Sequence, residues 1–171
     1  MYYFIGIKGS GMSALAIILK NLGYNVIGSD VENHFFTEEG LVENEIKFLT
    51  YDENNIKEDY VIVKGASIKE DNVELIKARE LGLKIYEYNE LVGEISKKFK
   101  TICIAGCHGK TTTTSMMSLV LEKLCGANYL IGDGRGYANP NNELFLLESC
   151  EYQRHFLAYH PYYTVITNID L

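Results

Sequence analysis

The sequence predicts an α/β protein built from two consecutive units, each a parallel sheet covered by helices. Three observations support this fold class. Short, continuous apolar segments alternate with amphipathic segments, a pattern typical of parallel strands buried on both faces. A glycine cluster follows the first apolar segment of each unit, where a strand would turn into a helix. The alternation is complete by about residue 99 and then begins again.

The first unit is predicted to alternate strands with helices. Each expected strand is a short run of apolar, β-branched or aromatic residues, and these runs lie at 2–7, 25–29, 47–51, 60–66 and 84–88. Amphipathic segments between them predict helices at 11–23, 36–44, 71–82 and 89–99. The helix at 71–82 is expected to begin with Asp71 as its N-cap and to end at Gly82.

The second unit continues the same alternation. Strands are expected at 101–106, 128–132, 143–149 and 163–169, and a long helix is expected at 110–124. No segment rich in proline, glycine and serine separates the two units, so we expect them to pack closely together. We therefore predict one domain over residues 1–98 and the first part of a second domain over residues 99–171.

Composition excludes several classes of protein. The net charge of −7 leaves no basic excess to neutralise nucleic-acid phosphates. No apolar run reaches the ~18 residues of a membrane span, and the N-terminus does not resemble a signal peptide. The cysteines, which show no zinc-binding spacing, are Cys103, Cys107, Cys125 and Cys150. We expect reduced, mostly buried thiols in a cytoplasmic protein that binds neither nucleic acid nor membrane.

The first glycine cluster, GIKGSGMSALA at residues 6–16, lies where the first strand turns into the first helix. Free N–H groups at a helix N-terminus favour phosphate binding. The dinucleotide fingerprint requires glycine where this chain has Lys8, because the pyrophosphate approaches the backbone there. An NAD site is therefore disfavoured, although Asp30 lies where a ribose-binding acid would be. A tight turn without ligand is one alternative, and another phosphate-bearing ligand is favoured.

The second cluster, GCHGKT at residues 106–111, has a more specific pattern. Lys110 can reach the terminal phosphates of a nucleotide, and the hydroxyl of Thr111 can bind Mg²⁺. Ile104 stands where the usual motif has its first glycine, so the loop is a compact variant. Together the clusters predict a Rossmann-like first unit and a P-loop-type second unit.

Five motifs, in order along the whole chain, resemble those of the Mur ligase family, the amide-forming enzymes of peptidoglycan synthesis. The stretches that carry the resemblance are GIKGSGMSALA (6–16), GSD (28–30), GASIKEDNVELIKARELG (65–82), GCHGKTTTT (106–114) and LESCEYQRHFLAYHPYYTVITNID (147–170). They are most similar to the motifs of the alanine-adding members. The agreement of five separate motifs is more specific than either glycine loop alone.

The resemblance implies an ATP-dependent ligase that joins L-alanine to UDP-N-acetylmuramate through an acyl phosphate, with ATP and Mg²⁺ as cofactors. The alternatives are a related tripeptide-recycling ligase and a non-catalytic module that binds a UDP-sugar or a dinucleotide. In the family, the TNID motif precedes the rest of the ATPase domain and a third domain. We therefore expect this chain to be inactive alone and to self-associate through an exposed sheet edge.

The resemblance also implies roles for individual residues. The expected ATP loop comprises Gly106, Cys107, His108, Gly109, Lys110, Thr111 and Thr112. Lys110 and His108 are the expected catalytic residues, with a structural role as an equal alternative for His108. Thr111 and Glu148 are expected to bind Mg²⁺, and Glu151 is the second choice for the carboxylate. The expected contacts of the UDP-sugar are Gly9, Ser10, Gly11, Met12, Asp30 and Ser67.

Overall fold

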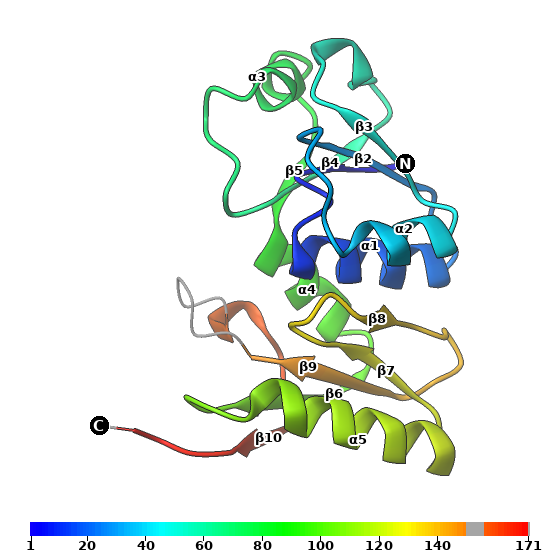
Figure 1. Cartoon of the computed structure of the whole chain (residues 1–171), viewed down its shortest axis with the longest axis vertical. Coiled ribbons are helices and arrows are strands. Elements are labelled where there is room, and N and C mark those ends of the chain that lie inside the picture. Colours follow the sequence, from blue (N-terminus) through cyan, green and yellow to red (C-terminus); the bar gives the residue numbers. More distant parts are fainter. Residues whose placement is uncertain (150–155, 171) are drawn as a thin grey trace.

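Two five-stranded sheets organise the chain in the computed structural model, which describes residues 1–149 and 156–170 (Figure 1). The strands of the first sheet are β1 (Tyr2–Ile5), β2 (Val26–Asp30), β3 (Lys47–Thr50), β4 (Val61–Lys64) and β5 (Ile85–Glu87). They are all parallel and lie in the order β3-β2-β1-β4-β5. The predicted parallel architecture of the first unit is confirmed.

The second sheet is mixed. Its strands are β6 (Lys100–Ala105), β7 (Ala127–Leu130), β8 (Gly136–Tyr137), β9 (Leu144–Glu148) and β10 (Tyr163–Ile166). The order is β10-β6-β9-β7-β8, in which only β8 runs antiparallel to its neighbour among the described strands. The sequence did not predict β8, because a two-residue strand is too short to show an apolar pattern.

Helix α1 (Ser10–Asn21) lies between the two sheets (Figure 1). The segment 12–19 is buried throughout, since the helix packs on the first sheet and also contacts β7 and β8. Helix α4 (Tyr88–Ser96) lies in the same layer, and its Leu91, Val92 and Ile95 join the hydrophobic cluster that includes Phe145 of β9. The two units therefore share one core, as the lack of a linker suggested. Their division near residue 98 stays a prediction.

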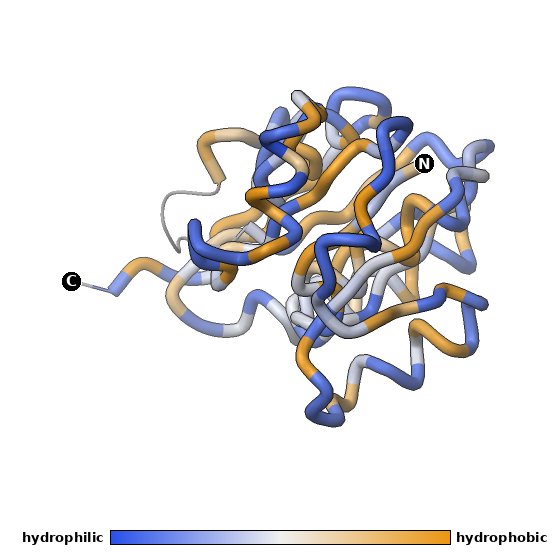
Figure 2. Tube along the Cα trace, turned by 90° about the horizontal axis from the view of Figure 1, so that it is seen from above, coloured by the Kyte–Doolittle hydropathy of each residue, from blue (hydrophilic) through white to orange (hydrophobic). Residues whose placement is uncertain are grey.

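The remaining helices cover the other surfaces. Helix α2 (Glu38–Glu43) lies beside α1, whereas α3 (Val73–Glu80) and the short helix η1 (Glu53–Asn55) cover the opposite face of the first sheet (Figure 1). A second apolar cluster fills the space beneath α3. Helix α5 (Lys110–Leu124) packs on the outer side of the second sheet. Apolar segments follow the inner strands and hydrophilic segments mark many of the outer turns (Figure 2).

Two local expectations need correction. The N-cap of α3 is Asn72 and not Asp71, because the Asn72 carboxamide accepts hydrogen bonds from the N–H groups of Glu74 (2.9 Å) and Leu75 (3.1 Å). The thiols are also less buried than expected. Cys103 is buried within β6, but Cys107 and Cys125 are exposed because they lie in the loop before α5 and at its end.

Cys150 lies outside the described residues. None of the helices in the described part of the chain combines the length and the apolar composition that crossing a bilayer requires.

Candidate functional site

The first glycine loop borders a cavity of about 320 Å³ at the carboxyl ends of β1 and β4. The order of the strands reverses between these two neighbours, and ligands of open parallel sheets bind in the crevice at such a point. The residues that line the cavity are Gly6, Gly9, Ser10, Gly11, Met12, Gly65, Ala66, Ser67 and Tyr88. The structure thus brings together all the predicted UDP-sugar contacts except Asp30.

The N-terminus of α1 opens into this cavity. The N–H of Ser13 is bonded to the carbonyl of Gly9 (2.8 Å), so the N–H groups before it have no partner within the helix. Such groups, together with the positive end of the helix dipole, suit a diphosphate. The ring of Tyr88 lies against Gly11, where a Cβ would be 2.9 Å from the ring and its hydroxyl. A glycine at this position therefore lets Tyr88 form one wall of the cavity.

Lys8 points away from the cavity. Its ammonium donates to the carbonyls of Val31 (2.9 Å) and Asn33 (3.0 Å) and pairs with Glu38 (2.8 Å). The side chain is only 5% exposed and lies over the ring of Phe48. Lys8 thus ties the first glycine loop to the segment between β2 and α2. The hydrogen bond from Lys8 lowers the pKa of Glu38 to about 2, against the opposing effect of partial burial.

Asp30 does not line the cavity. Its carboxylate accepts hydrogen bonds from the backbone N–H of Lys8 (2.7 Å), the N–H of Val31 (2.8 Å) and the hydroxyl of Tyr51 (3.3 Å). The Asp30 carboxylate and burial both raise the pKa of Tyr51, and burial has the larger effect. In this structure Asp30 fixes the shape of the first loop from the end of β2, and its expected contact with the uridine remains a prediction.

The second glycine loop connects β6 to α5, which begins at Lys110 as expected. Gly106 (φ +137°) and Gly109 (φ +79°) both lie in the left-handed region that favours glycine. A Cβ on Gly106 would also lie 2.1 Å from the hydroxyl of Thr167. The Lys110 ammonium donates to the carbonyl of Gly106 at 2.6 Å. It is therefore folded over the loop whose N–H groups could receive phosphates.

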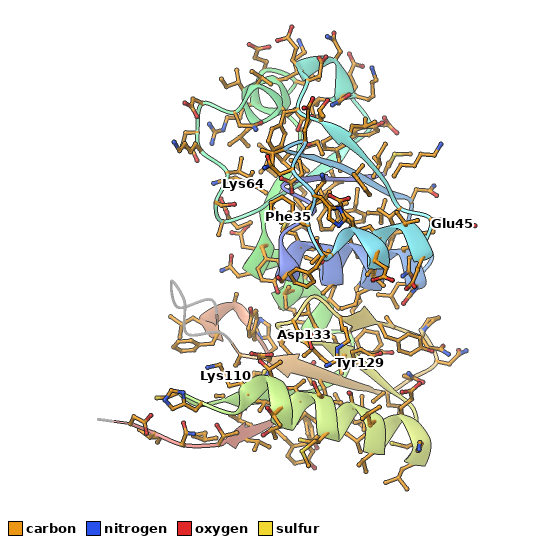
Figure 3. All side chains as sticks on the ribbon, viewed as in Figure 1. Phe35, Glu45, Lys64, Lys110, Tyr129 and Asp133 are labelled. Carbon is orange, nitrogen blue, oxygen red and sulfur yellow. The ribbon has the colours of Figure 1, made fainter. Side chains whose placement is uncertain are left out.

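The two predicted metal ligands meet at the edge of the second sheet. The Thr111 hydroxyl donates to Oε1 of Glu148 (2.9 Å), and the N–H of Gly132 donates to Oε2 (2.8 Å). Glu148 is the last residue of β9 and lies beside Ile104 of β6, so it reaches the start of α5. A hydroxyl and a carboxylate supply oxygen ligands of the kind that Mg²⁺ prefers. Figure 3 shows Lys110 at the beginning of the same helix.

Residues after β10 form the other side of the loop. Thr167 donates from its hydroxyl to the carbonyl of His108 (2.6 Å), and the N–H of His108 donates to the side chain of Asn168 (2.9 Å). The His108 imidazole is 81% exposed and lies 3.2 Å from the Asp170 carboxylate. The N–H of Asp170 donates to the Cys107 sulfur (3.4 Å). In this structure, His108 therefore contacts a carboxylate of the protein itself, that of Asp170.

Thr112 is exposed on the first turn of α5. Glu151, the second choice for the metal-binding carboxylate, lies outside the described residues. Within the described ranges, no group of three or more His, Cys, Asp or Glu side chains is arranged to hold a metal ion. A site built from Thr111 and Glu148 would therefore need nucleotide oxygens or water to complete it.

Tyr88, Gly132 and Asn168 are among the residues of these sites that sequence reasoning missed. Tyr88 begins α4, which the sequence places at the far end of the first unit, so only the packing of α4 beside α1 brings it to the cavity. Gly132 follows β7 and carries no side chain to identify it. Asn168 lies next to Thr167 in the TNID motif, and this motif could have indicated that Asn168 belongs to the site.

Comparison with known proteins agrees with the geometry. A model of the "Mur ligase family, catalytic domain" matches residues 1–100. UDP-N-acetylmuramate–L-alanine ligase from Lactiplantibacillus plantarum is 49% identical over 170 residues, which are 99% of this chain and 39% of that protein. The corresponding enzyme from Lacticaseibacillus casei is 48% identical over 169 residues. The chain thus spans about two fifths of the length of these relatives.

Solved structures show the same fold. UDP-N-acetylmuramate-alanine ligase from Thermotoga maritima superposes with a TM-score of 0.81 at 27% identity, over 98% of this chain and 41% of that one. UDP-N-acetylmuramate:L-alanyl-gamma-D-glutamyl-meso-diaminopimelate ligase from Neisseria meningitides gives a TM-score of 0.85 at 27% identity, over 99% of this chain and 60% of that one. The fold of nearly the whole chain is therefore that of the matching part of these two ligases.

Proposed function

Because the chain belongs to the Mur ligase family, we propose that it forms part of an ATP-dependent ligase that joins L-alanine to UDP-N-acetylmuramate during synthesis of the peptidoglycan precursor. Residues 1–98 would bind the UDP-sugar, and residues 99–171 would supply the first part of the ATP-binding domain. The observation that carries this proposal is the meeting of Lys110, Thr111 and Glu148 at one edge of the second sheet.

The chemistry explains why such a loop is needed. An amine cannot displace the oxygen of a carboxylate, which is a poor leaving group. In the proposed reaction, the carboxylate of the sugar nucleotide attacks the γ-phosphorus of ATP, and ADP leaves. The amine of L-alanine then attacks the carbonyl carbon of the acyl phosphate, and inorganic phosphate leaves. Because charge accumulates on the transferring phosphoryl group, fixed positive charge and N–H donors are the main means of catalysis.

Lys110 would contribute that charge. Its ammonium would exchange the carbonyl of Gly106, 2.6 Å away, for phosphate oxygens. When bound, Mg²⁺ would neutralise charge on the β- and γ-phosphates. Thr111 and Glu148 would be its protein ligands, since their oxygens already lie 2.9 Å apart. His108 lies in the same loop, and we propose that it contacts the phosphates or the sugar nucleotide's carboxylate.

The UDP diphosphate would occupy the 320 Å³ cavity at the N-terminus of α1. Gly9, Ser10, Gly11 and Met12 would supply N–H groups, and Ser67 would supply a hydroxyl from the other rim. A dinucleotide is the less suitable ligand, because the first loop lacks the central glycine of the dinucleotide fingerprint. Asp30 would act indirectly, by fixing the loop through the N–H of Lys8.

A second candidate is a ligase that adds a peptide, in place of L-alanine, to the same sugar nucleotide. The TM-score of 0.85 to the peptide-adding relative favours it, whereas the 49% identity to an alanine-adding relative favours the first candidate. Release of phosphate by the whole enzyme, supplied with L-alanine or with L-alanyl-γ-D-glutamyl-meso-diaminopimelate, distinguishes the two.

Calorimetry tests the proposed ligands on this chain directly. We expect UDP-N-acetylmuramate to bind and NAD to give no signal, and we expect ATP to bind only with Mg²⁺ present. Lys110→Ala should weaken ATP binding about 10- to 150-fold, which corresponds to the loss of one charge-assisted hydrogen bond.

Lys123→Ala is the matched control, because Lys123 is exposed in the last turn of the same helix. NAD binding without UDP-sugar binding would overturn the assignment of the first loop. Undiminished ATP binding in Lys110→Ala would overturn the assignment of the second.

A further inference from the structure

We propose that Gly132 is a positioning residue for the metal-binding carboxylate: its N–H, held in place by the turn at residues 131–135, fixes the orientation of Glu148. The proposal rests on the proposed function, because it takes Thr111 and Glu148 as the metal ligands. Gly132 itself touches neither nucleotide nor metal, and acts only through Glu148.

The contact between Gly132 and Glu148 is close and specific. The Gly132 N–H donates to Oε2 at 2.8 Å, while Oε1 accepts from Thr111 at 2.9 Å. Each oxygen of the carboxylate therefore has its own donor, and the two donors define the plane and the direction of the group. Each oxygen keeps a further lone pair, so the same orientation remains compatible with a bound cation.

Gly132 is also the residue type that this contact requires. A Cβ on Gly132 would lie 2.8 Å from Oε2 and 2.9 Å from Oε1 of Glu148. Gly132 is not among the residues with positive φ, so alanine is acceptable to the backbone there. Any side chain would nevertheless push the carboxylate aside.

The turn that carries Gly132 is anchored on three sides. Within the turn, the N–H of Ile131 donates to the carbonyl of Arg135 (2.9 Å). The Arg135 guanidinium binds the Asp133 carboxylate and also donates to the hydroxyl of Ser115 on α5 (2.7 Å). Burial alone would raise the pKa of Asp133, but the hydrogen bonds from Arg135 lower it overall.

The other anchors lie on the first unit. Gly136, just after the turn, lies so close to α1 that a Cβ there would be 2.2 Å from the carbonyl of Ala14. Gly134 packs against the methyl group of Thr37, whose hydroxyl donates to the carbonyl of Lys8 in the first glycine loop. Figure 3 shows Asp133 between α1 and the start of α5.

Because α1, α5 and the first glycine loop all restrain the turn, its N–H is a fixed donor. A carboxylate at the end of a strand has freely rotating side-chain bonds, and fixing it in advance reduces the entropy lost on metal binding. The turn also fixes the position of Glu148 relative to the first glycine loop. The metal site therefore has a defined position relative to the UDP-sugar cavity.

Gly132→Ala tests the inference without a large effect on the fold, since the atom it displaces is the far end of a flexible side chain. Mn²⁺ affinity in the presence of ATP, measured by electron paramagnetic resonance, should fall about 10- to 100-fold. Binding of UDP-N-acetylmuramate at the first glycine loop, which does not involve the metal, should stay within twofold. Gly40→Ala is the matched control, because its Cβ would lie at an ordinary 3.4 Å from Ile17.

A second measurement needs no ligand. The urea midpoint is measured for the wild type, Thr111→Val, Gly132→Ala and the double variant. If Gly132 holds the carboxylate against Thr111, then Thr111→Val lowers the midpoint less in the Gly132→Ala background than in the wild type.

Additive midpoints with unchanged Mn²⁺ affinity would overturn the inference. If the wild-type chain binds no nucleotide, the proposed function fails instead, and the double-variant cycle alone decides: additive effects overturn the role of Gly132, and non-additive effects support it.

Discussion

Glu74 is a completely buried carboxylate that joins four segments of the first unit, and its removal should destabilise the protein strongly. It lies on α3 with no exposed surface. Oε1 accepts from the Tyr3 hydroxyl (2.7 Å), the Asn55 side chain (2.8 Å) and the Asp52 N–H (3.2 Å), and Oε2 accepts from the Ser29 hydroxyl. All the partners are donors, and a carboxylate has enough lone pairs to accept from all of them.

The magnitude follows from the burial of the partners. Tyr3 and Ser29 are also completely buried, so Glu74→Leu would leave two hydroxyls without this acceptor. Each buried group left unsatisfied costs about 1–3 kcal/mol, so the two hydroxyls together cost about 2–6 kcal/mol. We expect a loss of this size, which lowers Tm by roughly 4–24 °C for a protein of this length.

Urea and thermal unfolding followed by circular dichroism give the measurement. Glu74→Gln keeps one acceptor for Tyr3, and Ser29 can turn to accept from the new amide, so its loss should be only about 1–2 kcal/mol. The matched control is Glu80→Leu on the same helix, where Glu80 is 61% exposed and the expected change is within ~0.5 kcal/mol. A Glu74→Leu variant within about 1 kcal/mol of the wild type would refute the reasoning.

Further predictions concern the two glycine loops. The pKa of Glu38 is lowered to about 2 from its ordinary value of 4.5, so its pairing with Lys8 contributes full stability above pH 4.5 and loses it as the pH falls toward 2. The difference in urea midpoint between the wild type and Glu38→Gln should shrink over that interval, and a constant difference would contradict the assignment. Gly106→Ala should lower the free energy of unfolding by about 1–3 kcal/mol through backbone strain. The contact of the new Cβ with Thr167 should lower it further. Gly109→Ala, whose Cβ would meet open space, isolates the strain, and equal losses in the two variants would show that the contact is unimportant.

Apart from β8 and η1, the order of the elements and both glycine loops could be predicted from the sequence, because they depend on local patterns. Apolar runs of four to six residues between amphipathic segments specify buried parallel strands. Helix α5 begins at Lys110 and ends at Leu124 as predicted, since glycine and a cysteine–glycine pair mark its ends. The pairing of Thr111 with Glu148 was also foreseeable, because strand ends of a parallel sheet meet at one edge.

The tertiary structure alone decided what surrounds those loops. Lys8 could be recognised in the sequence as a residue that disfavours a dinucleotide, but its direction depends on the carbonyls of Val31 and Asn33, which only the fold brings near it. Asp30 was expected at the uridine, yet it lies outside the lining of the cavity and bonds to the first loop. No sequence pattern singled out Glu74, which is buried because α3 packs on the first sheet.

The sequence by itself therefore determined the order of the predicted strands and helices and the two loops, because each depends on residues close together in the chain. It also indicated the pair of oxygens at the second loop, because the ends of parallel strands meet at one edge of a sheet. The tertiary structure decided that α1 is shared by both sheets, that Tyr88 forms one wall of the first cavity, and that Gly132 reaches Glu148. These contacts join different elements of the chain through groups that no sequence motif marks. They depend on how buried helices and turns fit together, and no local pattern records that fit.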